Sequence, residues 1–137
     1  MDNKHDFQLV AAPFTPFAPN GSLALGQISP MARMLHKNGV TGVFVCGTTG
    51  ESSSLTVAER KLVTTEWVRV RAPSLQIIAH VGHNCLADAC ELAEHAAACG
   101  ADAVGMMAPG FLRPATLEDL VACCAQVAAA APDLPFY

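Results

Sequence analysis

The 137-residue chain has few charged and few aromatic residues, which make up 15% and 6% of it. Its eight Lys and Arg are outnumbered by twelve Asp and Glu, and the net charge of −4 excludes a protein that binds nucleic acid by neutralising phosphates. It has no run of about 18 apolar residues, so no membrane-spanning helix is predicted. Residues 1–6 lack the basic and then apolar layout of a signal peptide, so we expect a cytoplasmic protein with neither nucleic acid nor membrane as a partner.

Cysteine pairs with the spacing Cys-x-x-Cys are also missing, although the chain contains six cysteines. Most of them lie among alanines on segments predicted to be helical, and Cys123 and Cys124 are adjacent and must point in different directions. In a cytosolic chain this pattern favours small buried hydrophobic side chains over a disulfide framework.

Apolar residues are abundant: 52% of the chain is hydrophobic and the mean hydropathy is +0.34. This composition excludes a disordered segment, in which low hydrophobicity and high net charge prevent collapse. The length fits one domain that is large enough to bury a core.

Short apolar runs alternate with longer amphipathic ones along the whole chain. The short runs predict strands at residues 7–12, 40–46, 75–81 and 101–108, with a fifth strand beginning at Leu134. The longer runs predict helices at residues 29–38, 57–70, 85–99 and 116–131.

Two of these helices carry recognisable start signals. Ser29 followed by Pro30 is typical of an N-cap and the first helical position, and Asn38-Gly39 is typical of a helix end. Thr56 and Glu59 form the Thr-x-x-Glu pattern of a capping box.

Strands that are joined through helices must pair in parallel, so the chain is predicted to have an α/β fold. Two architectures fit this order: a doubly wound open sheet, or the N-terminal half of an eight-stranded (β/α)₈ barrel, which needs about 250 residues when complete. The two differ in strand order, because a barrel keeps the sequence order whereas a doubly wound sheet reverses at a switch point.

The segment from Gly47 to Glu51, Gly-Thr-Thr-Gly-Glu, follows the second predicted strand, at the edge of a parallel sheet where ligands bind. Its two glycines permit tight turns with outward N–H groups, and the hydroxyls of Thr48 and Thr49 add donors, so the loop suits a small anion such as a carboxylate. It lacks the lysine of a phosphate-binding P-loop. A tight turn without a ligand, or a phosphate site on a flavodoxin-like sheet, remain alternatives at this point.

Residues 42–51, Gly-Val-Phe-Val-Cys-Gly-Thr-Thr-Gly-Glu, and residues 55–60, Leu-Thr-Val-Ala-Glu-Arg, resemble the dihydrodipicolinate synthase/N-acetylneuraminate lyase family. These enzymes are class I pyruvate aldolases on a (β/α)₈ TIM barrel. The resemblance extends over nearly the whole chain and implies the N-terminal half of that barrel, with about four βα units and the start of strand 5. It also implies that Thr48 and Thr49, between Gly47 and Gly50, hold the carboxylate of pyruvate, and that Glu51 has a structural role, bonding backbone near the helix start.

The stretch that follows the fourth predicted strand, residues 108–114, indicates the branch of the family. Dihydrodipicolinate synthases usually carry two tyrosines there, whereas this chain has Gly110 and Phe111, which cannot relay a proton. The stretch resembles the N-acetylneuraminate lyases, and so implies retro-aldol cleavage of this sialic acid to pyruvate and N-acetylmannosamine through a lysine Schiff base, without another cofactor. A different 2-keto acid aldolase of the family and a non-catalytic half-barrel interaction module are the alternatives. By the same resemblance a full-length protein would be a homo-oligomer, with a tetramer as the family's usual form.

No residue of the chain matches the family's catalytic lysine or tyrosine. Lys4 lies in the N-terminal tail, and Lys37 and Lys61 lie on amphipathic helices rather than on a strand. Tyr137 lies two residues before the position of the family's catalytic tyrosine, so we interpret it as an ordinary residue of the fifth strand. We therefore expect residues 1–137 to be a single partial barrel, truncated before both catalytic groups and inactive alone.

His80, His83 and Cys85 have residue types that bind zinc. Because His80 and His83 are three residues apart at a strand end, their side chains should diverge. We therefore expect hydrogen-bonded histidines and no metal site.

Overall fold

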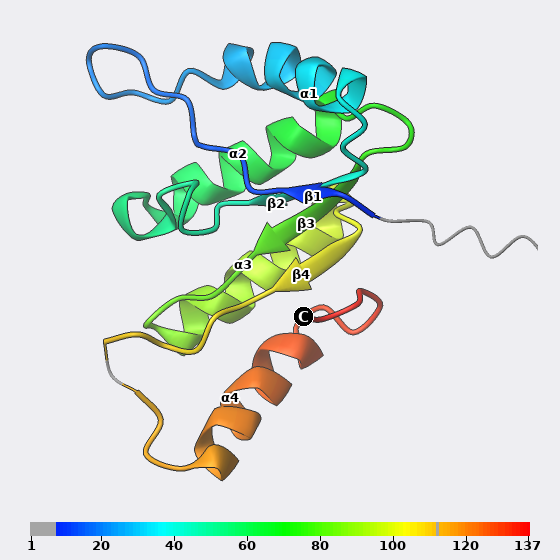
Figure 1. The fold of residues 1–137 in the computed structure, drawn as a ribbon. Helices are drawn as coiled ribbons and strands as arrows, with labels where there is room; N and C mark the ends of the chain where they lie inside the picture. Colours follow the sequence, from blue (N-terminus) through cyan, green and yellow to red (C-terminus); the bar gives the residue numbers. More distant parts are fainter. Residues whose placement is uncertain (1–7, 112) are drawn as a thin grey trace, which may run out of the picture.

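The computed structural model of the chain describes residues 8–111 and 113–137, and its centre is a parallel four-stranded sheet (Figure 1). The strands lie side by side in sequence order, β1-β2-β3-β4, so the sheet has the order of a barrel and not that of a doubly wound fold. The strands are β1 (Val10–Ala11), β2 (Gly42–Val45), β3 (Gln76–His80) and β4 (Ala103–Gly105).

The start of a fifth strand continues this order, as predicted. Phe136 forms a parallel bridge with Val104 on the outer side of β4. The Tyr137 N–H donates to the Val104 carbonyl at 3.0 Å, and the Met106 N–H donates to the Tyr137 carbonyl at 3.0 Å. The chain therefore contains four strands and the start of a fifth, in the successive order that a half-barrel requires.

Four helices alternate with the strands and pack against each other in sequence order along one face of the sheet (Figure 1). A short 3₁₀ turn precedes each of the first two helices, at Leu25–Gln27 and Ser52–Ser54. The α-helices are α1 (Ile28–Lys37), α2 (Val57–Val70), α3 (Leu86–Cys99) and α4 (Leu117–Ala129). None of the described helices is long and apolar enough to span a bilayer.

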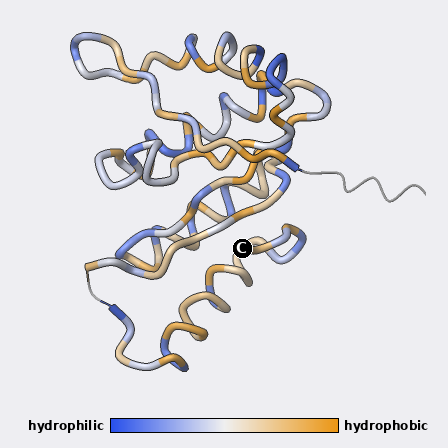
Figure 2. Tube along the Cα trace, in the orientation of Figure 1, coloured by the Kyte–Doolittle hydropathy of each residue, from blue (hydrophilic) through white to orange (hydrophobic). Residues whose placement is uncertain are grey.

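The core lies between the sheet and these helices. Alternate strand residues such as Val43, Val45 and Ile77 are fully buried there, and Trp67 of α2 is 1% exposed. Figure 2 shows hydrophobic residues along the central strands and along much of α4. Burying apolar surface at ~25 cal/mol per Å² is the main force that joins the two layers.

The local sequence patterns predicted the start of α2 correctly and the start of α1 less accurately. The Thr56 hydroxyl accepts from the Glu59 N–H, and the Glu59 carboxylate accepts from the Thr56 N–H, so the capping box is confirmed. Ser29, in contrast, is not an N-cap, because α1 already begins at Ile28 and the Ser29 hydroxyl instead accepts from Arg33. A proline is tolerated throughout the first turn, where no N–H is required, so Pro30 could not fix the start.

The predicted strands are longer than the observed ones, because their apolar runs continue past the strand ends into the adjoining loops. The run at 40–46 becomes Gly42–Val45, and the run at 101–108 becomes Ala103–Gly105. Phe7, the first residue of the first predicted strand, lies outside the described residues. All six cysteines are free thiols, as expected, but only Cys46 is fully buried and Cys85 is exposed.

Candidate functional site

The loop from Gly47 to Gly50 follows the carboxyl end of β2 and is flanked on each side by a residue with a strained backbone conformation. Cys46 and Glu51 adopt left-handed backbone conformations, with φ of 54° and 56°. Each such non-glycine residue costs about 1–3 kcal/mol and persists only where its surroundings hold it. The loop is thus a fixed shape and not a flexible connection.

Gly50 packs so closely that any added side chain would force its neighbours to shift. A Cβ atom at this position would lie 3.0 Å from the Cys46 Cα and 3.3 Å from the Pro13 carbonyl oxygen, both of which are backbone atoms. The buried Thr15 hydroxyl donates to the Gly50 carbonyl at 2.7 Å. Thr15 was missed by sequence reasoning, because it lies 35 residues away and no local pattern indicates the contact.

Thr48 and Thr49 are exposed at the tip of this loop, whereas Gly47 and Gly50 are buried. The turn closes through backbone bonds from the Glu51 N–H to the Thr48 carbonyl at 3.0 Å and from the Ser52 N–H to the Gly47 carbonyl at 3.3 Å. Within residues 8–111 and 113–137, neither threonine donates a hydrogen bond to another residue. The loop therefore offers two hydroxyls and two N–H groups to a ligand, which is the donor set that a carboxylate needs.

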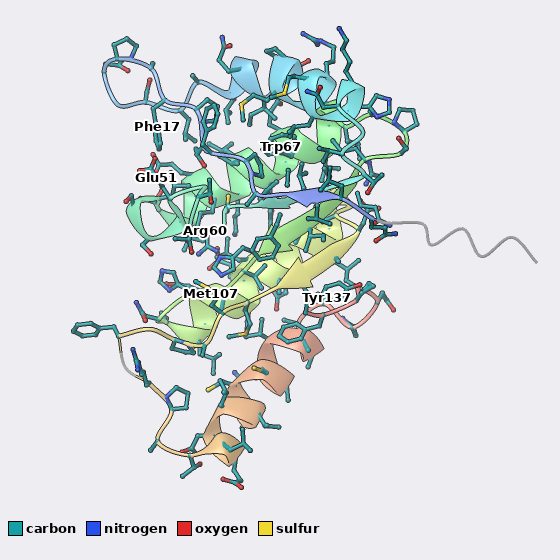
Figure 3. The ribbon with its side chains drawn as sticks, in the orientation of Figure 1. Phe17, Glu51, Arg60, Trp67, Met107 and Tyr137 are labelled. Carbon is teal, nitrogen blue, oxygen red and sulfur yellow. The ribbon has the colours of Figure 1, made fainter. Side chains whose placement is uncertain are left out.

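Glu51 contributes its backbone and not its side chain. It precedes the 3₁₀ turn at Ser52–Ser54, its carbonyl accepts from the Ser54 N–H at 2.8 Å, and its carboxylate makes no capping bond there. The expected bond of the Glu51 side chain to backbone near the helix start is therefore not seen, and the residue shapes the turn through its left-handed backbone instead. Figure 3 shows Glu51, Arg60 and Met107 towards the end of the sheet at which the strands finish.

Arg60 and His80 form a buried network behind the loop. Arg60 is 1% exposed and donates to the His80 carbonyl at 2.7 Å and to the Gly82 carbonyl at 3.0 Å. His80 Nδ1 lies 2.9 Å from the Cys46 carbonyl, and its Nε2 lies 3.4 Å from the Met107 N–H. A neutral ring with its proton on Nδ1 satisfies both contacts, so we assign that tautomer.

Burial keeps the His80 ring neutral and the Cys46 thiol protonated near neutral pH. Burial, assisted by the positive charge of Arg60, lowers the pKa of His80 to about 4. Burial raises the pKa of the Cys46 thiol to about 11, and burial lowers the pKa of Arg60. The network therefore positions the end of β2 and supplies neither a nucleophile nor a general base.

A cavity of about 230 Å³ opens beside the loop, at the carboxyl ends of β3 and β4. Ser52 and Ser53 belong to its wall, but Thr48 and Thr49 do not. The predicted carboxylate-binding residues and this cavity are therefore neighbours and not one pocket. The other lining residues are Leu55, Arg60, His80, Gly82, His83, Asn84 and residues 107–110.

The described lysines lie on helices, and the single tyrosine is exposed. Lys37 is exposed at the end of α1, and Lys61 on α2 pairs with Glu91 on α3. Lys4 lies outside the described residues. Tyr137 is 72% exposed, and its backbone pairs with β4 (Figure 3). No Schiff-base lysine is thus positioned on a strand within the described chain.

The two histidines at the end of β3 diverge. His80 turns into the buried network, whereas His83 lies in the following loop, beside Cys85 and Asp88. Asp88 was not considered from the sequence, although it lies three residues after Cys85 at the start of α3.

Comparisons with known proteins agree over almost all of the chain. The family model described as "Dihydrodipicolinate synthetase family" matches residues 7–137. N-acetylneuraminate lyase B of Xenopus laevis is 47% identical over 131 residues, which are 94% of this chain and 49% of that protein. The chain thus spans about half the length of this relative.

Solved structures give the same result. The N-acetylneuraminate lyase of Proteus mirabilis matches with a TM-score of 0.92 and 42% identity, over 95% of this chain and 44% of the other. A dihydrodipicolinate synthase matches with a TM-score of 0.87 and 35% identity, over 95% of this chain and 44% of the other. The expected half-barrel architecture is thereby confirmed.

Proposed function

The chain belongs to the dihydrodipicolinate synthetase family, and on that premise we propose that residues 47–50 bind the carboxylate of a 2-keto acid substrate. One observation carries this proposal: two exposed threonines that donate no hydrogen bond to other described residues stand on a loop held by Gly50, Thr15 and His80. A turn with a merely structural role would not need to present four donors outward at the ligand-binding end of a parallel sheet.

The reaction we propose is the retro-aldol cleavage of N-acetylneuraminate to pyruvate and N-acetylmannosamine. The 47% identity to an N-acetylneuraminate lyase supports this branch, as does the absence of tyrosine between residues 108 and 114. Class I aldolases of this family work through a lysine Schiff base and no external cofactor. The loop's role in such a reaction is to hold the substrate's acid end so that its keto carbon faces the amine.

We further propose that residues 1–137 alone do not turn over substrate. Lys37 and Lys61 lie on helices and not on a strand of the sheet, and Lys61 pairs with Glu91. Treating the chain with pyruvate and borohydride should therefore leave its mass unchanged. A stable mass increase, mapped to one lysine, would contradict this part of the proposal.

Two further features of the working protein are proposals of the same kind. Six free thiols fit a reducing compartment, and so support a cytoplasmic location. Homo-oligomerisation, as a tetramer, is proposed from the family resemblance. Another pyruvate-dependent aldolase of the family remains the second candidate, because the 35% identical dihydrodipicolinate synthase has the same fold over this region.

Calorimetric titration with pyruvate tests the carboxylate site. Thr48→Val and Thr49→Val each remove one hydroxyl donor while keeping the side-chain shape, and a hydrogen bond to a charged group contributes about 1.5 kcal/mol or more. Each substitution should weaken pyruvate binding about tenfold. Ser54→Ala, which removes an exposed hydroxyl from the next turn, is the matched control and should have no effect.

Three outcomes would count against the assignment. Equal affinity of both threonine variants and the parent chain would place the carboxylate elsewhere. Binding of inorganic phosphate in preference to pyruvate would favour the phosphate-site alternative. Release of pyruvate from other 2-keto acid aldols but not from N-acetylneuraminate, by the chain joined to the second half of the Xenopus laevis lyase, would favour the second candidate.

A further inference from the structure

We propose that His83, Cys85 and Asp88 form a binding site for a borderline-soft divalent metal ion of the zinc type, separate from the keto-acid loop. One ligand atom from each of the three side chains lies within 4.8 Å of the other two. Among the residues that the structure describes, this is the one group of three metal-ligating side chains brought together in this way. The expectation of no metal site, drawn from His80 and His83, did not include Asp88.

The local backbone brings the three side chains together. His83 and Cys85 lie in the loop after β3, Cys85 is the N-cap residue of α3, and Asp88 lies in the first turn of that helix. The Cys85 N–H donates to His83 Nδ1 at 3.0 Å, which fixes the imidazole ring over the helix start. Cys85 and Asp88 thus lie at the start of α3, and His83 is joined to that turn by the hydrogen bond from the Cys85 N–H.

The distances between the ligand atoms fit one shared ion. His83 Nδ1 lies 3.3 Å from the Asp88 Oδ2, so both atoms can bind the same ion. An ion bound at Nδ1 would take the place of the hydrogen bond that this nitrogen accepts from the Cys85 N–H. The Cys85 sulfur takes no part in the contact between the ring and the carboxylate, so its place beside them points to a metal ion and not to a simple pair.

The chemistry of the donors selects the kind of metal. One imidazole nitrogen, one sulfur and one carboxylate oxygen suit Zn²⁺ or Co²⁺, whereas Mg²⁺ and Ca²⁺ prefer oxygen ligands only. Three protein ligands leave a fourth tetrahedral position for water. Binding deprotonates the thiol and releases its proton to solvent.

The site is open to solvent and lies at the edge of the cavity described above. The side chains of His83 and Asp88 are 33% and 36% exposed, and Cys85 is exposed. His83 also lines the 230 Å³ cavity. An ion can therefore reach the three ligands without any unfolding, and it would pin the loop between β3 and α3 to the helix.

Titration of the 137-residue chain with Co²⁺, kept reduced, tests the proposal because Co²⁺ has visible bands and a thiolate charge-transfer band that report its ligands. We expect one equivalent to give tetrahedral bands with thiolate charge transfer, and Zn²⁺ to displace it, since Zn²⁺ binds more tightly to such ligands. Cys85→Ser should abolish the charge-transfer band, and Asp88→Asn should weaken Co²⁺ binding about tenfold or more. Cys90→Ser is the control, because Cys90 lies on the same helix and its sulfur points to the Gln126 carbonyl.

Other outcomes overturn the proposal. A charge-transfer band that survives Cys85→Ser and disappears with Cys123→Ser or Cys124→Ser would assign the metal to another thiol. Tight Co²⁺ binding without thiolate charge transfer would remove Cys85 from the site. An absence of binding at neutral pH would show that the three side chains do not form a metal site. Far-ultraviolet circular dichroism of each variant verifies that the fold is retained.

Discussion

His80 is the residue on which the position of the candidate loop depends most directly. Its ring joins the Cys46 carbonyl at the end of β2 to the Met107 N–H that follows β4, and Arg60 holds its backbone. Cys46 needs such support, because its left-handed φ of 54° is unfavourable for a residue with a side chain. The neutral state of His80 is therefore part of the fold.

This coupling predicts a loss of stability in mild acid. The pKa of His80 is lowered to about 4 in the folded chain, so the unfolded chain binds the extra proton as the pH falls from about 6.5 to 4. The neutral His80 ring therefore contributes up to about 3 kcal/mol to the free energy of unfolding. This contribution is fully present above about pH 6.5 and is lost progressively as the pH falls to about 4. Denaturant unfolding at pH 7 and pH 4.5 measures it.

His80→Asn provides the comparison for that measurement. An asparagine amide can still donate to the Cys46 carbonyl but does not titrate, so the variant should lose much less stability between the two pH values. A parent chain and a variant with the same pH dependence would show that His80 is not the titrating group.

At the scale of elements, the loop between β2 and α2 is the feature most sensitive to substitution. Gly50→Ala places a Cβ 3.0 Å from the Cys46 Cα, and overpacking against backbone costs about 1–3 kcal/mol. We expect this loss in the free energy of unfolding together with weaker pyruvate binding. Gly110→Ala is the control, because no atom lies within 4 Å of its added Cβ. Equal stability of the two variants would mean that the loop shape is not fixed as described.

The same elements show what sequence alone can predict. The capping box of Thr56 and Glu59 spans only four residues, so the helix Val57–Val70 could be predicted from the local sequence. The contacts of Thr15 with Gly50 and of Arg60 with His80 join residues 35 and 20 positions apart, and no periodicity encodes them. A buried arginine is especially hard to foresee, because arginine is mostly an exposed residue. The loop's identity was thus predictable, whereas the residues that hold it were not.

At the scale of the whole molecule, the described residues cover only one face of the sheet. The helices bury Val45 and Ile77 on one side, while the other side presents a groove lined partly by Phe44, Val10 and Tyr137. Val10 is 42% exposed and Tyr137 is 72% exposed. An apolar sheet face next to an open strand edge favours association with another chain.

We therefore expect the 137-residue chain to self-associate, with a sedimentation coefficient that rises with concentration. Val10→Lys puts a charge on the edge strand β1 and should shift the chain towards monomer. Met34→Lys adds the same charge to α1, where Met34 is 51% exposed, and should leave the association unchanged. A parent chain that stays monomeric at all concentrations, or a Met34→Lys variant that dissociates equally, would contradict this expectation.

A crystal structure of the chain soaked with pyruvate tests the carboxylate site at residues 47–50 most directly. We expect the pyruvate carboxylate to lie within hydrogen-bonding distance of the hydroxyl and N–H groups of Thr48 and Thr49. Pyruvate bound only in the neighbouring cavity beside Arg60, with those two threonines making no contact to it, would contradict the proposed site.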